Sequence, residues 1–382
     1  MTTTFSVARL PRIEFGAGVL RRLPGIAAGY GRRLLLVTGV RSFVESAGGA
    51  WLLGELAAQG FSWQQLAVAG EPSPQVVDDA VARLRGADID LVIGIGGGSA
   101  LDAAKAVAGL LKPGNSVLDH LEGVGPERPY RGPSTPFIAV PTTAGTGSEA
   151  TRNAVLSVAG QYKKSFRDDR LVAEWAIVDP DLLATCPPDL IAADGMDALT
   201  QLVESFVSAR ANPVTDALAR SGLAAASGAL MRFHGNPDDA EAREQMAYAS
   251  LLSGICLAQT GLGCVHGIAA PLGAFFPISH GVACGTLLAA ATRVNLDALR
   301  RRDPSNVALA KYDELRRVFG AADLVGLFEG WQRHLQLPRL SACGVTAADV
   351  PRIVASSRGS SMRTNPVTLS DAEIAGVVEE RL

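Results

Sequence analysis

The fold of this 382-residue chain is decided by the stretch Gly94-Ile95-Gly96-Gly97-Gly98-Ser99-Ala100-Leu101-Asp102-Ala103-Ala104-Lys105, a cluster of glycines between two regular patterns. Residues 89–93 before it are mostly branched aliphatics and predict a buried parallel strand. Residues 100–111 after it are rich in Ala and Leu and predict a helix, with Ser99 placed to cap its first turn. Bare glycines let a phosphate approach the backbone, and the helix N-terminus favours its negative charge, so the turn predicts a pyrophosphate site.

A second loop with a similar setting follows the next predicted strand. Residues 135–140 predict a strand that runs into Pro141-Thr142-Thr143-Ala144-Gly145-Thr146-Gly147-Ser148-Glu149. Hydroxyl side chains and glycines crowd this loop at the carboxyl end of a strand, where open α/β sheets bind ligands. A glycine turn alone also occurs where packing is merely tight, so the interpretation depends on the two loops together.

The pattern of the chain changes near residue 188. Before it, strand-like runs at residues 33–38, 90–95, 137–140 and 175–178 alternate with helical stretches, as in a parallel sheet covered by helices. After it, long Ala- and Leu-rich segments dominate. We therefore predict an α/β dinucleotide-binding domain, a parallel sheet with helices, over residues 1–188 and an all-α domain over residues 189–382. The consecutive prolines at 187–188 mark the connection.

Composition excludes several classes of protein. The 48% of hydrophobic residues is too high for a disordered chain, and the net charge of −3 gives no reason to expect nucleic acid or an anionic membrane as a partner. The five cysteines show no C-x-x-C spacing and are interpreted as small core residues in a reducing cytosol. Neither a membrane span nor a secretion signal is evident, so we expect a cytoplasmic protein.

The chain resembles the iron-containing (group III) alcohol dehydrogenases, within the dehydroquinate synthase-like superfamily. The resemblance rests on motifs that occur in order: Gly96-Gly97-Gly98-Ser99 with Asp102 and Lys105, Thr142 to Glu149, Val178-Asp179-Pro180, Gly195-Met196-Asp197-Ala198-Leu199-Thr200, Val265-His266-Gly267, Pro271-Leu272-Gly273 and His280-Gly281. It implies an enzyme, active as a homodimer, that transfers a hydride between NAD(P) and a small alcohol, aldehyde or ketone.

The resemblance also implies a divalent metal such as Fe²⁺ or Zn²⁺, held in the family by one Asp and three His. Asp197, His266 and His280 match this pattern, whereas the fourth position holds Gln201. An amide oxygen is usually a weaker donor than an imidazole, which leaves three alternatives. Gln201 or a water completes the site, the site prefers an ion such as manganese or magnesium, or the site is empty. We expect it to be occupied, because one Asp and two His suffice when helices hold them in place.

Further roles follow from the resemblance. Asp197, His266 and His280 are the expected catalytic residues, with the ion as Lewis acid. The expected cofactor contacts are Gly39, Ser42, Gly96, Gly97, Gly98, Ser99, Asp102, Thr142, Thr143, Thr146, Asn153, Val155 and Lys164.

The end of the first long strand predicts the cofactor preference. NAD-preferring relatives often carry an Asp where this chain has Gly39, and that Asp repels a 2′-phosphate. Gly39 removes the repulsion, and Arg41 and Ser42 could contact the phosphate. We expect a preference for NADP, with NAD also accepted.

Three other functions stay open. One is a metal-free NAD(P)H-dependent carbonyl reductase similar to the maleylacetate reductases, in which His266 or His280 would hold the carbonyl oxygen. Another is a nonredox lyase similar to dehydroquinate synthase. The last is a catalytically weakened binding protein, suggested by Gln201 and by Ala270, which stands where many relatives carry a further His.

Overall fold

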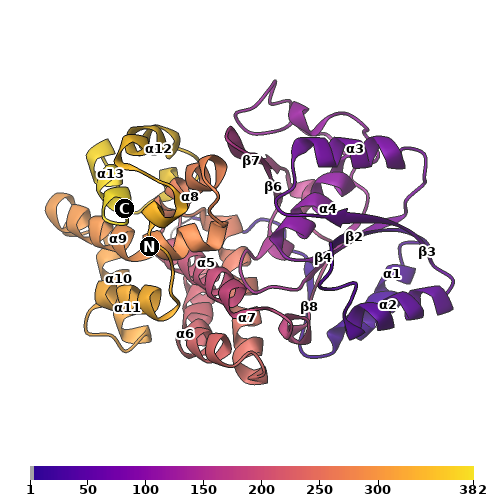
Figure 1. Cartoon of the computed structure of the whole chain (residues 1–382), viewed down its shortest axis with the longest axis horizontal. Coiled ribbons are helices and arrows are strands. Elements are labelled where there is room, and N and C mark those ends of the chain that lie inside the picture. The colour runs from indigo at the N-terminus through magenta and orange to yellow at the C-terminus, as the bar shows by residue number, and fades with distance from the viewer. Residues whose placement is uncertain (1–3) are drawn as a thin grey trace. The chain divides into compact units, whose positions relative to one another are not determined.

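The computed structural model describes residues 4–382, and the chain divides into two compact units (Figure 1). The sheet unit consists of Ala8–Val158 and Lys163–Cys186. The helical unit consists of Pro187–Leu382 together with residues 4–7 and 159–162.

The sheet unit contains a six-stranded sheet in which every pairing is parallel. Its order is β1-β8-β5-β4-β2-β3, with β1 (Arg12–Phe15), β2 (Arg33–Gly39), β3 (Ser62–Val68), β4 (Leu91–Gly96), β5 (Phe137–Pro141) and β8 (Trp175–Val178). A separate two-stranded sheet holds β6 (Asn153–Val158) and β7 (Tyr162–Arg167). The predicted fold class, a parallel sheet with helices followed by a helical part, is confirmed.

Helices cover both faces of this sheet. On one face Ile93 and Ile95 of β4 share a fully buried cluster with Leu23 of α1 (Leu23–Ala28) and Leu52 of α2 (Ala47–Ala58). On the other face Gly94 lies so close to α4 (Gly98–Leu110) that a Cβ there would stand 2.7 Å from Cβ of Ala104. Figure 1 shows α4 and α3 (Pro74–Leu84) on one side of β2 and β4, and α1 and α2 on the other. Burying each such Leu or Ile contributes about 2 kcal/mol.

The strand order places a ligand site. From β2 the chain continues outward to β3, whereas β4, β5 and β8 follow one another on the opposite side of β2. Ligands of open α/β sheets bind outside the carboxyl ends of the strands at such a reversal, here β2 and β4. Gly39 ends β2 and the glycine turn follows β4, so both lie at this point.

The N-cap predicted for α4 is wrong. The helix begins at Gly98, its N-cap is Gly97, and Ser99 lies inside the first turn. The cause is the neighbouring loop, because a Cβ at Gly98 would stand 2.7 Å from Cγ2 of Thr146. The chain therefore starts the helix with glycines, and no side chain caps the first turn.

The helical unit is built around α5 (Pro188–Val207), which begins with a proline at a position that suits it and is buried along residues 195–207. Helices α6, α7 and α9 pack against it. The helices that follow α5 are α6 (Pro213–Gly235), α7 (Ala240–Thr260), α8 (Cys264–Phe275), α9 (His280–Arg302), α10 (Val307–Val318), α11 (Leu324–His334), α12 (Val350–Ser356) and α13 (Asp371–Glu379).

Among the described residues, α9 is the one helix that by itself has the length and hydropathy of a membrane span, and 72% of that apolar window is buried. Helices α7 and α8 reach the same threshold only as a pair bent by 101°. Since α9 packs on α5, α8, α11 and α13, its apolar surface is used inside its own unit, as in the core helix of a soluble protein.

Candidate metal and cofactor sites

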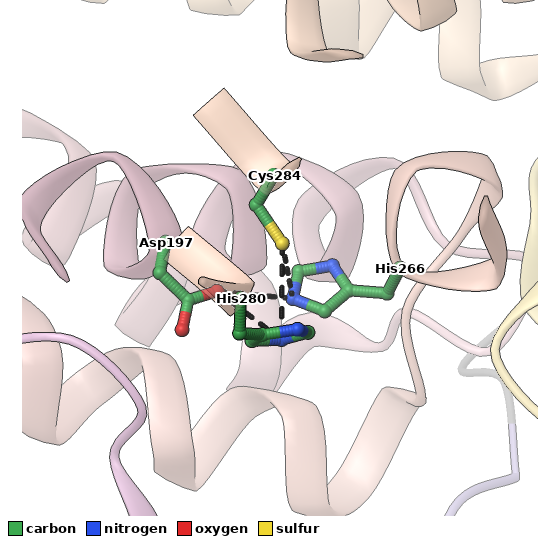
Figure 2. A group of neighbouring side chains, drawn as sticks. All are labelled: Asp197, His266, His280 and Cys284. Atoms are coloured by element: carbon green, nitrogen blue, oxygen red, sulfur yellow. Dashed lines mark hydrogen bonds and ion pairs between the residues drawn. The ribbon is translucent and has the colours of Figure 1, made fainter. Parts of the chain in front are cut away.

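Three helices of the helical unit bring the predicted metal ligands together. Asp197 lies in the middle of α5, His266 in the first turn of α8, and His280 is the first residue of α9. Figure 2 shows these three side chains and Cys284 of α9 pointing toward one another. One donor atom from each of the four lies within 4.8 Å of the other three.

The distances within this group, the donor cluster, are short. Nε2 of His266 lies 3.2 Å from Oδ1 of Asp197, and Nε2 of His280 lies 3.8 Å from the same oxygen. Sγ of Cys284 lies 3.6 Å from Nε2 of His266 and 3.8 Å from Nε2 of His280. The Asp197 side chain is 1% exposed and that of His280 is 26% exposed, so the cluster is buried except on the side of His280.

Glu204, two helical turns after Asp197 on α5, holds His266 in place. Its carboxylate accepts hydrogen bonds from the backbone amides of Gly263 at 3.0 Å and Val265 at 2.6 Å, at the start of α8. The same carboxylate lies 2.7 Å from Nδ1 of His266. A carboxylate accepts hydrogen bonds, so Nδ1 of His266 donates to Glu204, and Nε2 faces the cluster, where it would offer a lone pair to an ion that displaces its proton.

A close approach of α9 to α5 makes the cluster tight. A Cβ at Gly281 would stand 2.2 Å from the carbonyl oxygen of Ala193, a distance that no side chain tolerates. Glycine at this position therefore lets the first turn of α9, which carries His280, lie directly against α5.

Charge in the cluster favours a cation. Burial alone would lower the pKa of His266, yet its neighbours Cys284, Asp197 and Glu204 raise it well above its ordinary value. Burial raises the pKa of Asp197, but the charge of His280 and hydrogen bonds from His266 and Gln201 outweigh it and hold that pKa at about 2. A divalent ion would supply the positive charge that these groups stabilise.

Gln201, predicted as a ligand, lies one turn after Asp197 and is 3% exposed. Its Oε1 accepts a hydrogen bond from Oγ of Ser253 at 2.8 Å, and its side chain helps to lower the pKa of Asp197. Two residues that the sequence analysis did not single out also belong here: Cys284 is part of the donor cluster, and Glu204 contacts His266. Both stand at helical spacing from predicted ligands, seven residues after Asp197 and four after His280.

The donor cluster fits a divalent ion. A carboxylate oxygen and two imidazole nitrogens are ligands that zinc and iron take in proteins, and a thiol adds a fourth donor. The carboxylate behind His266 is the supporting contact that metal-bound imidazoles usually have.

In the sheet unit, the two predicted cofactor loops lie against each other. A Cβ added at Gly97 would stand 3.3 Å from Cγ2 of Thr143, and a Cβ added at Gly98 would stand 2.7 Å from Cγ2 of Thr146. The amide of Thr142 donates to the carbonyl oxygen of Gly96 at 3.0 Å. The N-terminus of α4, which no side chain caps, begins where the loops meet. Its first-turn amides suit a phosphate.

Lys105 and Asp102 of α4 hydrogen-bond to the second loop at Ser148 and to β6. Nζ of Lys105, which is fully buried, donates to the carbonyl oxygens of Ser148 and Asn153, both at 2.8 Å. Asp102 accepts from Oγ of Ser148 at 2.6 Å and from the amide of Val155 at 3.0 Å. Burial lowers the pKa of Lys105 to about 8 and raises that of Asp102. These residues position the loop.

The remaining predicted cofactor residues have different settings. Gly39 ends β2 beside Gly96, and Oγ of Ser42 lies near it. Arg41 is exposed and its Nε lies 3.4 Å from Oε1 of Glu45. Lys164 of β7 is exposed, and its Nζ lies near Gly123.

Fold and site together define a class: a parallel α/β unit with a glycine turn at its strand reversal, followed by a helical unit with a buried cluster of metal-type donors. Residues 11–180 match the family model described as iron-containing alcohol dehydrogenase. Residues 191–382 match the model for the C-terminal part of the Fe-containing alcohol dehydrogenase family. The chain belongs to the iron-containing alcohol dehydrogenase family.

Several known proteins are similar to it. Long-chain-alcohol dehydrogenase 1 of Geobacillus thermodenitrificans is 43% identical over 221 residues, which is 58% of this chain and 55% of that protein, so the match spans about half the length of this relative. Lactaldehyde reductase of Escherichia coli is 31% identical over 346 residues, 89% of each chain. The crystal structure of sulfoacetaldehyde reductase from Bifidobacterium kashiwanohense in complex with NAD+ has a TM-score of 0.86 at 27% identity and covers 99% of both chains.

Proposed function

We propose that this chain is an NAD(P)-linked oxidoreductase that interconverts a small alcohol and its aldehyde or ketone, with a divalent metal at the donor cluster. The observation that carries the proposal is the cluster itself, in a chain that matches both family models. The similar proteins are named as an alcohol dehydrogenase and two aldehyde reductases.

On the cofactor side, the sheet unit would bind the pyrophosphate at the N-terminus of α4. The amides of the first turn face the point where Gly97 and Gly98 meet the second loop, and they offer donors and a positive dipole. Thr143 and Thr146 lie at the same point, and the amide of Thr142 donates to the carbonyl oxygen of Gly96. The nicotinamide would accept or supply the hydride.

On the metal side, Asp197, His266 and His280 would hold the ion, which when bound acts as a Lewis acid toward the substrate oxygen. Glu204 keeps the Nε2 lone pair of His266 directed at the cluster. Gln201 lies one helical turn after Asp197 and would support its carboxylate. The partly exposed side of the cluster, at His280, is where a substrate oxygen would enter.

The decisive experiment combines metal analysis with turnover. Purified protein, as isolated, chelated and reloaded with Zn²⁺ or Fe²⁺, is assayed against a panel of alcohols, diols, aldehydes and ketones by nicotinamide absorbance. We expect turnover that is lost on chelation and restored by the ion. Carbonyl reduction that survives chelation would instead identify a metal-free reductase. Product without net change in absorbance would identify a lyase, and no turnover with an ion-free protein would identify a binding protein.

A preference for NADP belongs to the same proposal. Gly39 ends β2 next to Gly96 and carries no carboxylate that could repel a 2′-phosphate. We expect kcat/KM to be higher with NADP than with NAD, and Gly39→Asp to reverse the order. A strong NAD preference in the unaltered protein would contradict this interpretation of Gly39.

A homodimer in the cytoplasm completes the proposal. The low net charge supports a protein without nucleic-acid or membrane partners. Light scattering on the purified protein measures the oligomeric state, and a monomeric mass would overturn the dimer.

A further inference from the structure

Cys284 is the member of the donor cluster for which the proposed function gives no role. It lies one helical turn after His280 on α9 and is buried. Its Sγ is within 3.8 Å of both imidazole Nε2 atoms, and Figure 2 shows it pointing at the same point as they do. A thiol at this place is either a packing residue or a fourth donor.

Gln201 does not offer its oxygen to the cluster. Its Oε1 is engaged by Oγ of Ser253, which donates to it at 2.8 Å. An amide nitrogen with its protons has no lone pair for a metal. The fourth position is therefore open to another residue.

Four of the six distances between the donors are close to the edges of a tetrahedron around one ion, and all six are within 4.8 Å. With metal–nitrogen and metal–oxygen bonds near 2.0 Å and a metal–sulfur bond of about 2.3 Å, tetrahedral edges are about 3.6 Å for N···S and about 3.3 Å for N···O. The two N···S distances are 3.6 and 3.8 Å, and the N···O distances are 3.2 and 3.8 Å. Little movement of the side chains is needed to close the site.

We propose that Cys284 is the fourth metal ligand of this protein, in place of the residue at position 201, and that the site takes a thiolate-accepting ion such as Zn²⁺. The inference rests on the proposed metal-dependent function. On binding, the thiol gives its proton to the solvent and its sulfur lone pair to the ion, so one proton is released for each ion bound through sulfur. Soft thiolate ligands favour zinc, while Gln201 acts only as a positioning residue for Asp197.

Cobalt substitution tests the sulfur bond without using activity. The chelated protein is loaded with Co²⁺, whose bond to a thiolate gives an intense charge-transfer band in the near ultraviolet. We expect the band in the unaltered protein and in Cys256→Ser, a matched control because Cys256 is buried in α7 with its thiol against the carbonyl of Thr215. We expect it to be absent from Cys284→Ser. A band that persists in Cys284→Ser, or cobalt bound without the band, overturns the assignment.

Gln201 supplies the second arm. Gln201→Ala removes a neighbour of Asp197 but no ligand, so we expect it to keep the band while metal affinity falls about 10–100-fold. Cobalt that binds the unaltered protein without the band, and binds Gln201→Ala more weakly than Cys284→Ser, would assign the fourth position to Gln201 instead.

X-ray absorption on the zinc-loaded, unaltered protein tests the same ligand and does not depend on whether a variant folds. One sulfur at about 2.3 Å is expected, whereas a shell of only nitrogen and oxygen, or no bound ion, refutes the ligand. The alcohol assay separates the two proposals. Turnover without a sulfur bond supports the proposed function and refutes Cys284 as a ligand. A sulfur bond without nicotinamide turnover supports Cys284 as a ligand and refutes the proposed function.

Discussion

At the scale of single residues, Glu204 matters most among the groups that are not themselves metal ligands. It links the start of α8 to Nδ1 of His266. Glu204→Gln replaces one accepting oxygen by an NH₂ group and can no longer fix the ring's tautomer reliably. We expect zinc affinity to fall about 10–100-fold, with alcohol oxidation falling alongside it. Competition with a chromophoric chelator measures the affinity.

Asn365 provides the control for this variant. Its Oδ1 accepts from the amide of Cys264 at 3.0 Å, also at the start of α8, and its other hydrogen bonds go to Asn295 and the carbonyl of Val367. Asn365→Ala should lower the free energy of unfolding by about 2–4 kcal/mol, because it also removes buried hydrogen bonds to Asn295 and Val367, and leave zinc affinity unchanged. An equal loss of affinity in both variants would mean that the helix end, and not the tautomer, explains the effect.

Glu149 gives a pH-dependent prediction away from the metal. Burial raises its pKa to about 7 from an ordinary 4.5, although a backbone hydrogen bond and the charge of Lys105 act against this. A group whose pKa is higher in the folded state stabilises the protein fully below the unfolded pKa and loses this contribution as the pH rises to the folded one. Glu149→Gln stays neutral, so its stability relative to the unaltered protein should rise between about pH 4.5 and 7, by up to about 3 kcal/mol. Denaturant unfolding at both ends of this range measures it, and a constant difference would rule out burial as the cause.

The positions of single residues in the sequence already predicted part of the metal site. Asp197, His266 and His280 were predicted as a group, and they lie together in the structure. Cys284 and Glu204 carry the same helical spacing signal, four and seven residues from predicted ligands, but spacing alone does not say which buried polar residue faces which neighbour. The orientation of the Gln201 amide depends on Ser253, 52 residues away, and no local pattern reports it.

At the scale of elements, burial decided what could be predicted. Strand β8 was predicted at its observed bounds, and β2, β4 and β5 within two residues, because central strands of a parallel sheet are apolar on both faces. Strand β3 lies at the sheet edge, and Gln64 and Gln65 expose their side chains, so the apolar pattern is absent. Strand β7 is mostly polar for the same reason.

The junction of the two cofactor loops is also a property of elements. A Cβ at Gly98 would meet Thr146, so Gly98→Ala must push the second loop away from the start of α4. We expect the Kd for NADP to rise at least about tenfold, an energy of about 1.4 kcal/mol, measured by titration calorimetry. Gly54→Ala in α2, where a Cβ meets nothing within 4 Å, should leave Kd unchanged and slightly raise stability. Unchanged binding in Gly98→Ala would show that the cofactor does not use this junction.

At the scale of the whole molecule, the two proposed ligand sites lie in different units. The donor cluster draws all its residues from α5, α8 and α9 of the helical unit, and the glycine turn and second loop lie in the sheet unit. A ligand that binds only the folded state stabilises what it binds, by about 2.7 kcal/mol at a hundredfold excess over Kd. Metal and cofactor should therefore stabilise different parts of the chain.

Hydrogen exchange of backbone amides resolves these parts. Zinc should slow exchange most in residues 195–207, 263–270 and 280–288, which surround the cluster, because local opening there separates the ligands. NADP should slow it most at residues 96–101 and 142–149, where the two loops meet. Each ligand is added alone to the chelated protein, so that the protection due to that ligand is measured separately.

Zinc protection confined to the sheet unit would place the ion elsewhere, and NADP protection confined to the helical unit would remove the glycine turn from the cofactor site. In Cys284→Ser, zinc protection of residues 280–288 should weaken more than that of residues 195–207. The reason is that α9 would bind the ion through both His280 and Cys284, and the variant leaves it only His280.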